Sequence, residues 1–223
     1  MTNEEITQNY GEIIEKTVGF VKDKLKEAEG GHDWYHIQRV WNNALHIADI
    51  EGTGNRLVIE LAALLHDIAD AKFHNGDESI GPKLAGDHMK SLALPEVIMD
   101  KVIFIIENIS FRKHHQNNTA NSVELQIVQD ADRLDALGAI GIARAFNYGG
   151  FKNRPLYEPQ ELKETAMPSL ITSSNHTIGH FYEKLLLLKG LMNTPTGKQM
   201  AEERHSYMVT FLNEFYKEWE GKK

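Results

Sequence analysis

Residues 61–70 are Leu61-Ala-Ala-Leu-Leu-His66-Asp67-Ile68-Ala69-Asp70, an apolar run that ends in a histidine and two aspartates. The longer run 56–69 is rich in alanine and leucine and too long for a typical strand, so it predicts a buried helix. Polar groups are costly in such a helix unless they are paired or coordinated. At roughly 100° per residue, His66, Asp67 and Asp70 share an arc of about 100°. The alternative is a helix end where these side chains simply reach solvent.

The composition is that of an ordinary globular protein, with 223 residues, 41% hydrophobic and 25% charged. A net charge of −8 without a long basic block argues against nucleic acid or an anionic membrane as partner. The absence of cysteine excludes disulfides and thiolate metal sites, so a metal would need histidine and carboxylate ligands. There is no signal-peptide pattern and no apolar run of about 18 residues, so we expect a cytoplasmic protein.

Hydrophobic periodicity predicts an all-α fold of about seven to nine helices in a single domain spanning residues 1–223. The expected helices cover 4–29, 32–50, 56–69, 77–92, 95–111, 122–146, 176–191 and 196–219. A strand is the alternative for the Val- and Ile-rich segment 95–111. Residues 147–175, which contain a Gly-Gly pair and three prolines, are expected to form a lid or an irregular connection. Helices 176–219 are expected to pack on a motif-bearing core at about 31–146.

The expected helix 122–146 carries acidic residues on its apolar stripe. Asp132 and Asp135 occupy positions at which leucine or valine would be expected. Asp130 points about 160° away from Asp132 and is predicted to be solvated. Asp132 is therefore the acid predicted to face inward most clearly. A purely structural role, in which Asp132 or Asp135 caps a neighbouring helix, stays open.

His36 lies at the edge of the apolar arc of the expected helix 32–50, a place where a histidine is more often packed than ligating. Together with His66, Asp67 and Asp132 it completes a set of two imidazoles and two carboxylates from three helices. Such a set suits one divalent ion of Mn, Mg, Co, Ni, Fe or Zn. Four protein ligands on an octahedral ion leave two positions for water and substrate, as in catalytic sites.

The order of these motifs resembles the HD-domain metal-dependent phosphohydrolase superfamily, in its branch of small stand-alone bacterial hydrolases and nucleotide pyrophosphohydrolases. The resemblance rests on three segments: GHDWYHIQRVWNNALHIA at 31–48, LAALLHDIADAKF at 61–73 and IVQDADRLDALGAIGIARAF at 127–146. The resemblance is specific because an adjacent His-Asp pair on an apolar helix is followed later in the chain by the stretch ADRLDA at 131–136. It implies a helical fold, a divalent ion on His36, His66, Asp67 and Asp132, and hydrolysis of phosphoester or phosphoanhydride bonds.

The resemblance also implies roles beyond the metal ligands. Asp70 matches an acid beside the metal in the guanosine-tetraphosphate hydrolase branch, so it is the candidate for orienting or deprotonating the attacking water. Arg39 and Lys72 are candidates for holding substrate phosphate, on position and charge. The two extra histidines of the dinuclear branch have no clear match, because His88 and the pair at 114–115 are only loosely placed.

The resemblance favours an enzyme that hydrolyses nucleoside phosphates, as a nucleotidase or a pyrophosphohydrolase. The alternative is a non-catalytic module that binds or senses nucleotides, and the intact ligand set argues against it. An HD-fold diiron oxygenase would need further ligands that the sequence does not place. The sequence does not decide the exact substrate or the oligomeric state, and a homodimer stays open.

Overall fold

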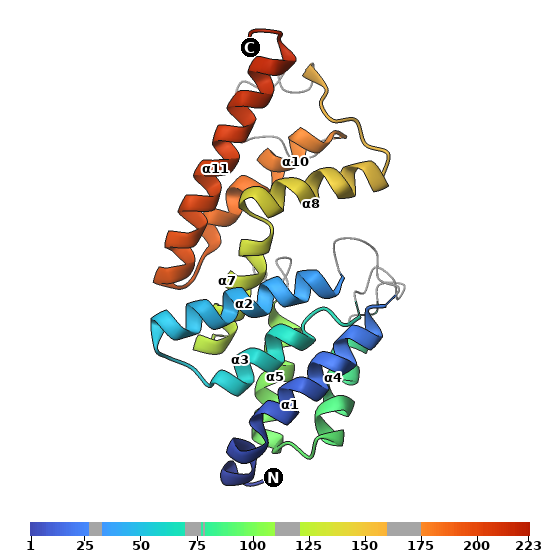
Figure 1. Ribbon diagram of the computed structural model, residues 1–223, viewed down its shortest axis with the longest axis vertical. Helices are drawn as coiled ribbons and strands as arrows, with labels where there is room; N and C mark the ends of the chain where they lie inside the picture. Colours follow the sequence, from blue (N-terminus) through green and yellow to red (C-terminus); the bar gives the residue numbers. More distant parts are fainter. Residues whose placement is uncertain (27–32, 70–76, 78, 110–120, 160–174) are drawn as a thin grey trace. The chain divides into compact units, whose positions relative to one another are not determined.

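A computed structural model describes residues 1–26, 33–69, 77, 79–109, 121–159 and 175–223 of the chain (Figure 1). These residues form nine α-helices and one 3₁₀ helix, and no strand occurs among them. The prediction of an all-α fold is confirmed. Within the same residues, no helix combines the length and the apolar character that crossing a membrane requires.

The chain divides into two compact units, Met1–Ala131 and Asp132–Lys223. Helix α7 (Val123–Asp135) spans the boundary between them. The expectation that the C-terminal helices pack on the motif-bearing core within a single domain stays a prediction.

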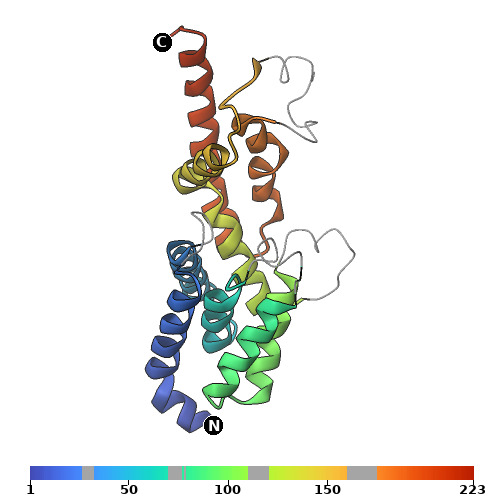
Figure 2. The same cartoon turned by 90° about the vertical axis from the view of Figure 1, so that its right-hand side faces the viewer.

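Helix α3 is the centre of the first unit. It packs against α1, α2 and α5, and α4 packs against α5, as Figures 1 and 2 both show. All nine residues from Leu57 to Leu65 are buried, which agrees with the predicted buried helix. The bounds are α1 (Asn3–Lys24), α2 (Trp34–Glu51), α3 (Arg56–Leu65), α4 (Ile80–Ser91) and α5 (Glu96–Asn108).

Side-chain caps explain where the first helices begin. Thr2 and Glu5 form a reciprocal capping box at the start of α1. Asp33 accepts from the backbone N–H of His36 at the start of α2, and Asn55 accepts from Val58 at the start of α3. Segment 96–108 is helical with the buried side chains at helical spacing, so the strand alternative for it is wrong.

Helix α3 ends at Leu65, four residues earlier than expected, and His66–Ala69 form a turn. The His66 side chain accounts for this early end. Its Nδ1 lies 2.9 Å from the carbonyl oxygen of Ala63. In a continuing helix that carbonyl would accept from the N–H of Asp67, four residues on. The imidazole competes for the same acceptor, as polar side chains at helix ends commonly do.

The second unit contains α8 (Gly138–Phe151), α10 (Thr177–Glu183), η3 (Leu185–Leu191) and α11 (Pro195–Trp219). Helix α11 packs against α8 and η3, and α10 packs against both of these as well. The rings of Phe146, Phe181 and Phe211 contact one another where α8, α10 and α11 meet. Thr194 caps α11 and Pro195 occupies its first turn.

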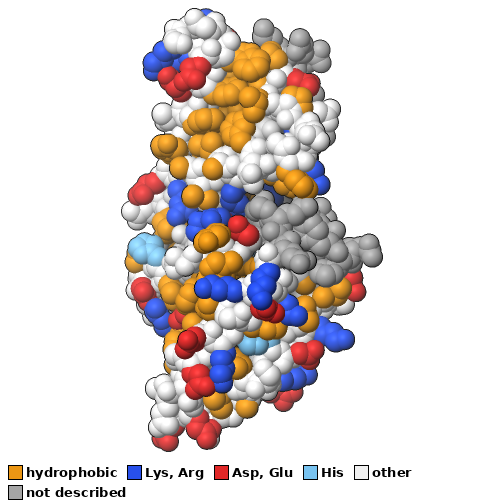
Figure 3. All heavy atoms as spheres, turned by 45° about the vertical axis from the view of Figure 1, so that its right-hand side comes forward, with side chains coloured by type: hydrophobic (Ala, Val, Ile, Leu, Met, Phe, Trp, Pro, Cys, Tyr) orange, Lys and Arg blue, Asp and Glu red, His pale blue; other side chains and the backbone are white. Residues whose placement is uncertain are grey.

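Hydrophobic side chains gather on part of the surface of the second unit in the view of Figure 3. Its large apolar side chains that reach solvent include Tyr148, Phe151, Leu156 and Trp219. Lys152 lies over the rings of Tyr148 and Phe151, so a cation shields part of this apolar surface.

The structure differs from three of the sequence predictions. The single helix expected over 122–146 is two helices, α7 and α8, because Gly138 adopts a left-handed φ of 70° that ends the run. The expected helix 176–191 is α10 followed by the 3₁₀ helix η3. Asp130, predicted to be solvated, is fully buried. Residues 125–135 of α7 are buried on several sides, so one inward stripe does not describe this helix.

Candidate metal centre

His36 is fixed near the start of α2 by the cap of that helix. Asp33 Oδ1 accepts from the backbone N–H of His36 at 2.9 Å. The His36 side chain is 3% exposed. The sequence placed this residue only at the edge of the apolar arc. Its burial shows that it points into the unit, as a ligand would.

His66 and Asp67 follow directly after the last residue of α3. The 2.9 Å contact between His66 Nδ1 and the Ala63 carbonyl is a hydrogen bond in which the ring donates. A neutral imidazole that donates from Nδ1 carries its lone pair on Nε2. His66 Nε2 is buried, so the backbone presents a basic nitrogen to the interior of the unit. Metal-ligating histidines are commonly oriented in this way.

The three side chains converge. One ligand atom from each of His36, His66 and Asp67 lies within 4.8 Å of the other two. His36 Nε2 is 3.9 Å from Asp67 Oδ2. The two imidazole rings meet edge to face, with their centroids 5.4 Å apart. Two helices that are distant in sequence therefore bring two nitrogens and one carboxylate to a single point.

This group of donors fits a divalent ion. Ligand atoms at about 2.1 Å from one ion lie about 3 Å apart when adjacent and about 4.2 Å apart when opposite. Separations within 4.8 Å need only a small contraction to reach that range. Imidazole and carboxylate are ligands for the borderline and hard divalent ions predicted from the sequence.

The structure describes only some of the other predicted site residues. Asp132, the expected fourth ligand, is half-buried and is the first residue of the second unit, so its place at the ion stays a prediction. Arg39 is half-buried on α2, one turn after His36. Asp70 and Lys72 lie outside the described residues, as does the histidine pair at 114–115.

Sequence reasoning gave no role to two polar residues on the helices that lead to the ligands. Asn43, two turns along α2 from His36, donates from Nδ2 to the carbonyl oxygen of Ala131 at 3.3 Å, directly before Asp132. Glu60 is a buried carboxylate within α3. The signal for Glu60 was available, since it is a charged residue inside the apolar run that precedes His66.

Asp135 was expected on the inward stripe, and it is buried. Its Oδ2 accepts from Arg144 Nη1 at 2.5 Å, and its backbone carbonyl accepts from the same guanidinium at 3.3 Å. The ion pair joins the end of α7 to α8 across the break at Gly138. This contact supports a structural role for Asp135.

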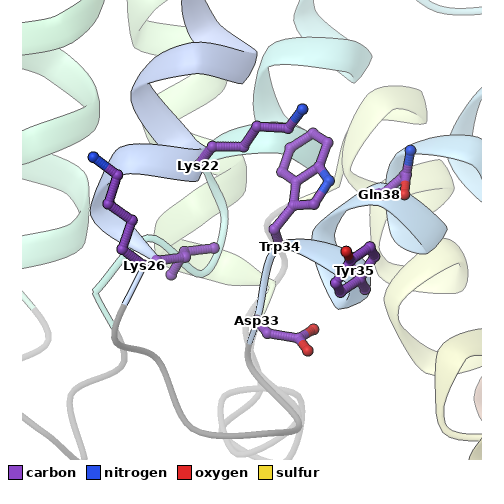
Figure 4. Close-up of a pocket in the computed structure, with 7 residues that line it drawn as sticks. Lys22, Lys26, Asp33, Trp34, Tyr35 and Gln38 are labelled. Carbon is purple, nitrogen blue, oxygen red and sulfur yellow. The ribbon is translucent and has the colours of Figure 1, made fainter.

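A separate hollow of about 570 Å³ lies where the end of α1 meets the start of α2 (Figure 4). Its lining includes Lys22, Trp34 and Gln38, and the Lys22 ammonium sits 4.7 Å from the centroid of the Trp34 ring. On α2, Trp34 and Gln38 lie about 160° around the helix from His36. The hollow is therefore on the flank of α2 away from the candidate ligands.

Comparisons with known proteins point to one family. The HD-domain family model matches residues 33–137, a range that contains His36, His66, Asp67 and Asp132. The uncharacterized protein YpgQ of Bacillus subtilis is 36% identical over 203 residues, which cover 91% of each chain.

Solved structures agree. An HD-superfamily hydrolase from Bacillus thuringiensis is 47% identical, with a TM-score of 0.76 over 94% of this chain and 98% of that one. Bacillus subtilis YpgQ in complex with ADP is 32% identical, with a TM-score of 0.73 over 93% and 95% of the two chains. The convergent His-His-Asp group, the helical fold and these likenesses together show that this chain belongs to the HD-domain family and has the fold of the HD-superfamily hydrolases.

Proposed function

We propose that this protein hydrolyses phosphoester or phosphoanhydride bonds of nucleoside phosphates and requires a divalent ion held by His36, His66, Asp67 and Asp132. The observation that carries the proposal is the convergence of His36, His66 and Asp67 within 4.8 Å, with the His66 tautomer set by the Ala63 carbonyl. Asp132 joins the set by its place in the family motif. A bound divalent ion supplies Lewis acidity toward a phosphate oxygen and an activated water.

The remaining roles belong to side chains of this chain. Asp70 follows Asp67 by three residues and would accept the proton of the attacking water, while Asp67 contributes to catalysis as a ligand. Arg39 and Lys72 would bind substrate phosphate and offset charge that develops on the phosphoryl group. Local cations are needed because a protein with a net charge of −8 repels anionic substrates at long range.

The nucleotide part of the proposal is supported by a relative. YpgQ of Bacillus subtilis forms a complex with ADP, and its structure covers nearly the whole of this chain. The same complex would also be expected of a module that binds nucleotides without turnover. Such a module is the second candidate, and only turnover separates the two.

The test combines metal analysis with a substrate panel. Metal-free protein would be loaded in turn with Mn²⁺, Co²⁺, Mg²⁺ and Zn²⁺ and given nucleoside mono-, di- and triphosphates. Released phosphate and pyrophosphate would be detected separately, which identifies the bond that breaks. We expect turnover that depends on the ion. Saturable nucleotide binding without turnover under any ion would favour the binding module instead.

Variants test the ligand assignment. His66→Ala and Asp67→Ala are expected to lose bound metal and hydrolysis while staying helical, and Asp132→Ala is expected to do the same. Matched controls are His46→Ala on α2 and Asp100→Ala on α5, whose side chains are exposed. Full metal occupancy in His66→Ala or Asp67→Ala, by elemental analysis, would place the ion elsewhere.

A further inference from the structure

Glu60 is a charged residue buried in the apolar core of the first unit. It is 4% exposed and lies in the middle of α3, which the structure describes throughout and whose eight other buried residues are all apolar. A buried carboxylate is costly unless hydrogen bonds replace its lost water. Its presence in the helix that leads to the His-Asp pair therefore needs an explanation.

Three helices meet at this carboxylate. The Tyr10 hydroxyl of α1 donates to Glu60 Oε1, and Trp41 Nε1 of α2 donates to Oε2 at 2.8 Å. Arg56 Nε, one turn earlier on α3, is 3.3 Å from Oε1 and balances the charge. Burial, together with the bond to Glu60, raises the pKa of Tyr10, so the hydroxyl remains a donor. We call Tyr10, Trp41 and Glu60 the polar node.

The node ties together the two helices that carry the candidate ligands. Trp41 lies five residues after His36 on α2, and Glu60 lies six residues before His66 on α3. At 1.5 Å per residue these separations are about 8 Å and about 9 Å along the helix axes. On both helices the node residue lies about 120° to 140° around the axis from the ligand. The node therefore holds one flank of the α2–α3 pair, and the ligands meet on another.

Apart from His36, the other buried side chains of these two helices are apolar. The buried face of α2 contains Ala44 and Ala48 beside Ile37, Val40 and Ile47, and α3 contributes Ala62 and Ala63. Apolar contacts are non-directional, so they fix the distance between two helices better than the rotation of each about its axis. A rotation of about 15° moves an atom about 6 Å from the axis by about 1.6 Å. A metal centre tolerates only about 0.5 Å.

We propose that Glu60, through the Tyr10 and Trp41 donors, is a positioning residue that fixes the rotation of α2 against α3 and thereby holds His36 and His66 at metal-binding distance. The proposal rests on the metal centre of the proposed function. The positioning role predicts that the stability of the fold and the affinity for metal can be changed separately. A protein with apolar side chains of similar volume at the node can be as stable as one with the polar node. Only the geometry at the ligands should then be lost.

The test replaces the whole node with apolar side chains. The variant Tyr10→Phe/Trp41→Phe/Glu60→Met leaves no buried donor or acceptor unpaired, and Arg56 keeps its partner Asp49. Tyr216→Phe is the control, since it removes a tyrosine hydroxyl that lies 3.0 Å from that of Tyr182 in the second unit. Co²⁺ affinity would be measured by titration, coordination by the visible Co²⁺ spectrum, and metal-free stability by thermal unfolding.

We expect the node variant to unfold, metal-free, within a few degrees of the unsubstituted protein, to bind Co²⁺ at least tenfold more weakly and to show an altered Co²⁺ spectrum. The single change Glu60→Gln keeps one acceptor and should give an intermediate loss of affinity. Co²⁺ affinity within twofold of the unsubstituted protein would overturn the positioning role and leave the proposed function standing. If the node variant is strongly destabilised, the Co²⁺ affinity of Glu60→Gln is used instead. An affinity within twofold of the unsubstituted protein would then overturn the positioning role. An unsubstituted protein that binds no divalent ion would refute the metal centre and the positioning role together.

Discussion

Gly149 and its neighbour Gly150 provide a matched pair for testing how closely helices pack in the second unit. A Cβ at Gly149 would stand 2.2 Å from Thr177 Oγ1 and 3.3 Å from Thr177 Cβ, whereas a Cβ at Gly150 meets nothing within 4 Å. Thr177 is buried at the start of α10, and it is β-branched, so its side chain has few alternative rotamers. The same substitution at adjacent positions should therefore change stability in opposite directions.

The magnitudes follow from two terms. Gly→Ala inside a helix stabilises by about 0.5 to 1 kcal/mol. Overpacking a well-filled site costs about 1 to 3 kcal/mol. We expect Gly150→Ala to gain about 0.5 to 1 kcal/mol, and Gly149→Ala to lose about 1 to 2 kcal/mol net. At about 2 to 4 °C per kcal/mol for a chain of this size, the two Tm values should differ by about 3 to 12 °C.

Calorimetry or urea unfolding of the two variants measures the difference directly. The double variant Gly149→Ala/Thr177→Ala removes the oxygen that the new methyl group meets. It should recover part of the loss relative to the sum of the single changes. Equal stability of Gly149→Ala and Gly150→Ala would refute the close approach of α8 and α10 described here.

Asp135→Ala should lower the free energy of unfolding by about 1 to 3 kcal/mol, because it removes the buried carboxylate that accepts from the Arg144 guanidinium. A double-mutant cycle with Arg144→Ala, measured by urea unfolding, should show that the two side chains are energetically coupled, and additive losses would contradict the pairing. Burial lowers the pKa of His88, so the folded protein favours the neutral imidazole. The resulting contribution to stability is complete above about pH 6.5, the pKa of an unperturbed histidine, and is lost as the pH falls toward the lower pKa of the folded state. The unfolding midpoint of His88→Gln should therefore change less between pH 7 and pH 5 than that of the unsubstituted protein. An equal change in both proteins would show that other groups cause the loss of stability in acid. If the proposed hydrolysis is observed, Asp70→Asn should keep metal and substrate affinity while kcat falls by about 10²–10⁴-fold. A kcat near that of the unsubstituted protein would show that Asp70 is not the general base.

The sequence predicted the helical class and the His66-Asp67 pair because both depend on local patterns. An apolar run of helical length is visible in the sequence, and so is the polar pair that ends it. The convergence of His36 with that pair was inferred from the chemistry of the combined ligand set and from the family motif, since helical spacing within one segment carries no information about a second helix. The structure supplies that contact directly.

The failures have local and non-local causes. The break between α7 and α8 depends on a left-handed Gly138, and glycine in a sequence permits that conformation without requiring it. Asp130 was predicted to be solvated because one inward stripe was assumed, yet Gln129, Asp130 and Ala131 are all buried in succession. Helical phase separates an inside from an outside only when a helix has one buried side.

The end of α3 at Leu65 has a consequence for the charge that the site attracts. The carbonyl end of a helix carries a partial negative charge of about half a unit, which adds to the carboxylate of Asp67. A cation bound by His66 and Asp67 would act as the C-terminal cap of α3, neutralising the dipole of the most buried helix in the unit. Metal would then stabilise the core itself, by an amount that grows with the logarithm of its concentration above Kd. Removal of the ion should destabilise α3, beginning at its C-terminal turn. The occupancy of the site would therefore affect the stability of the central helix of the unit.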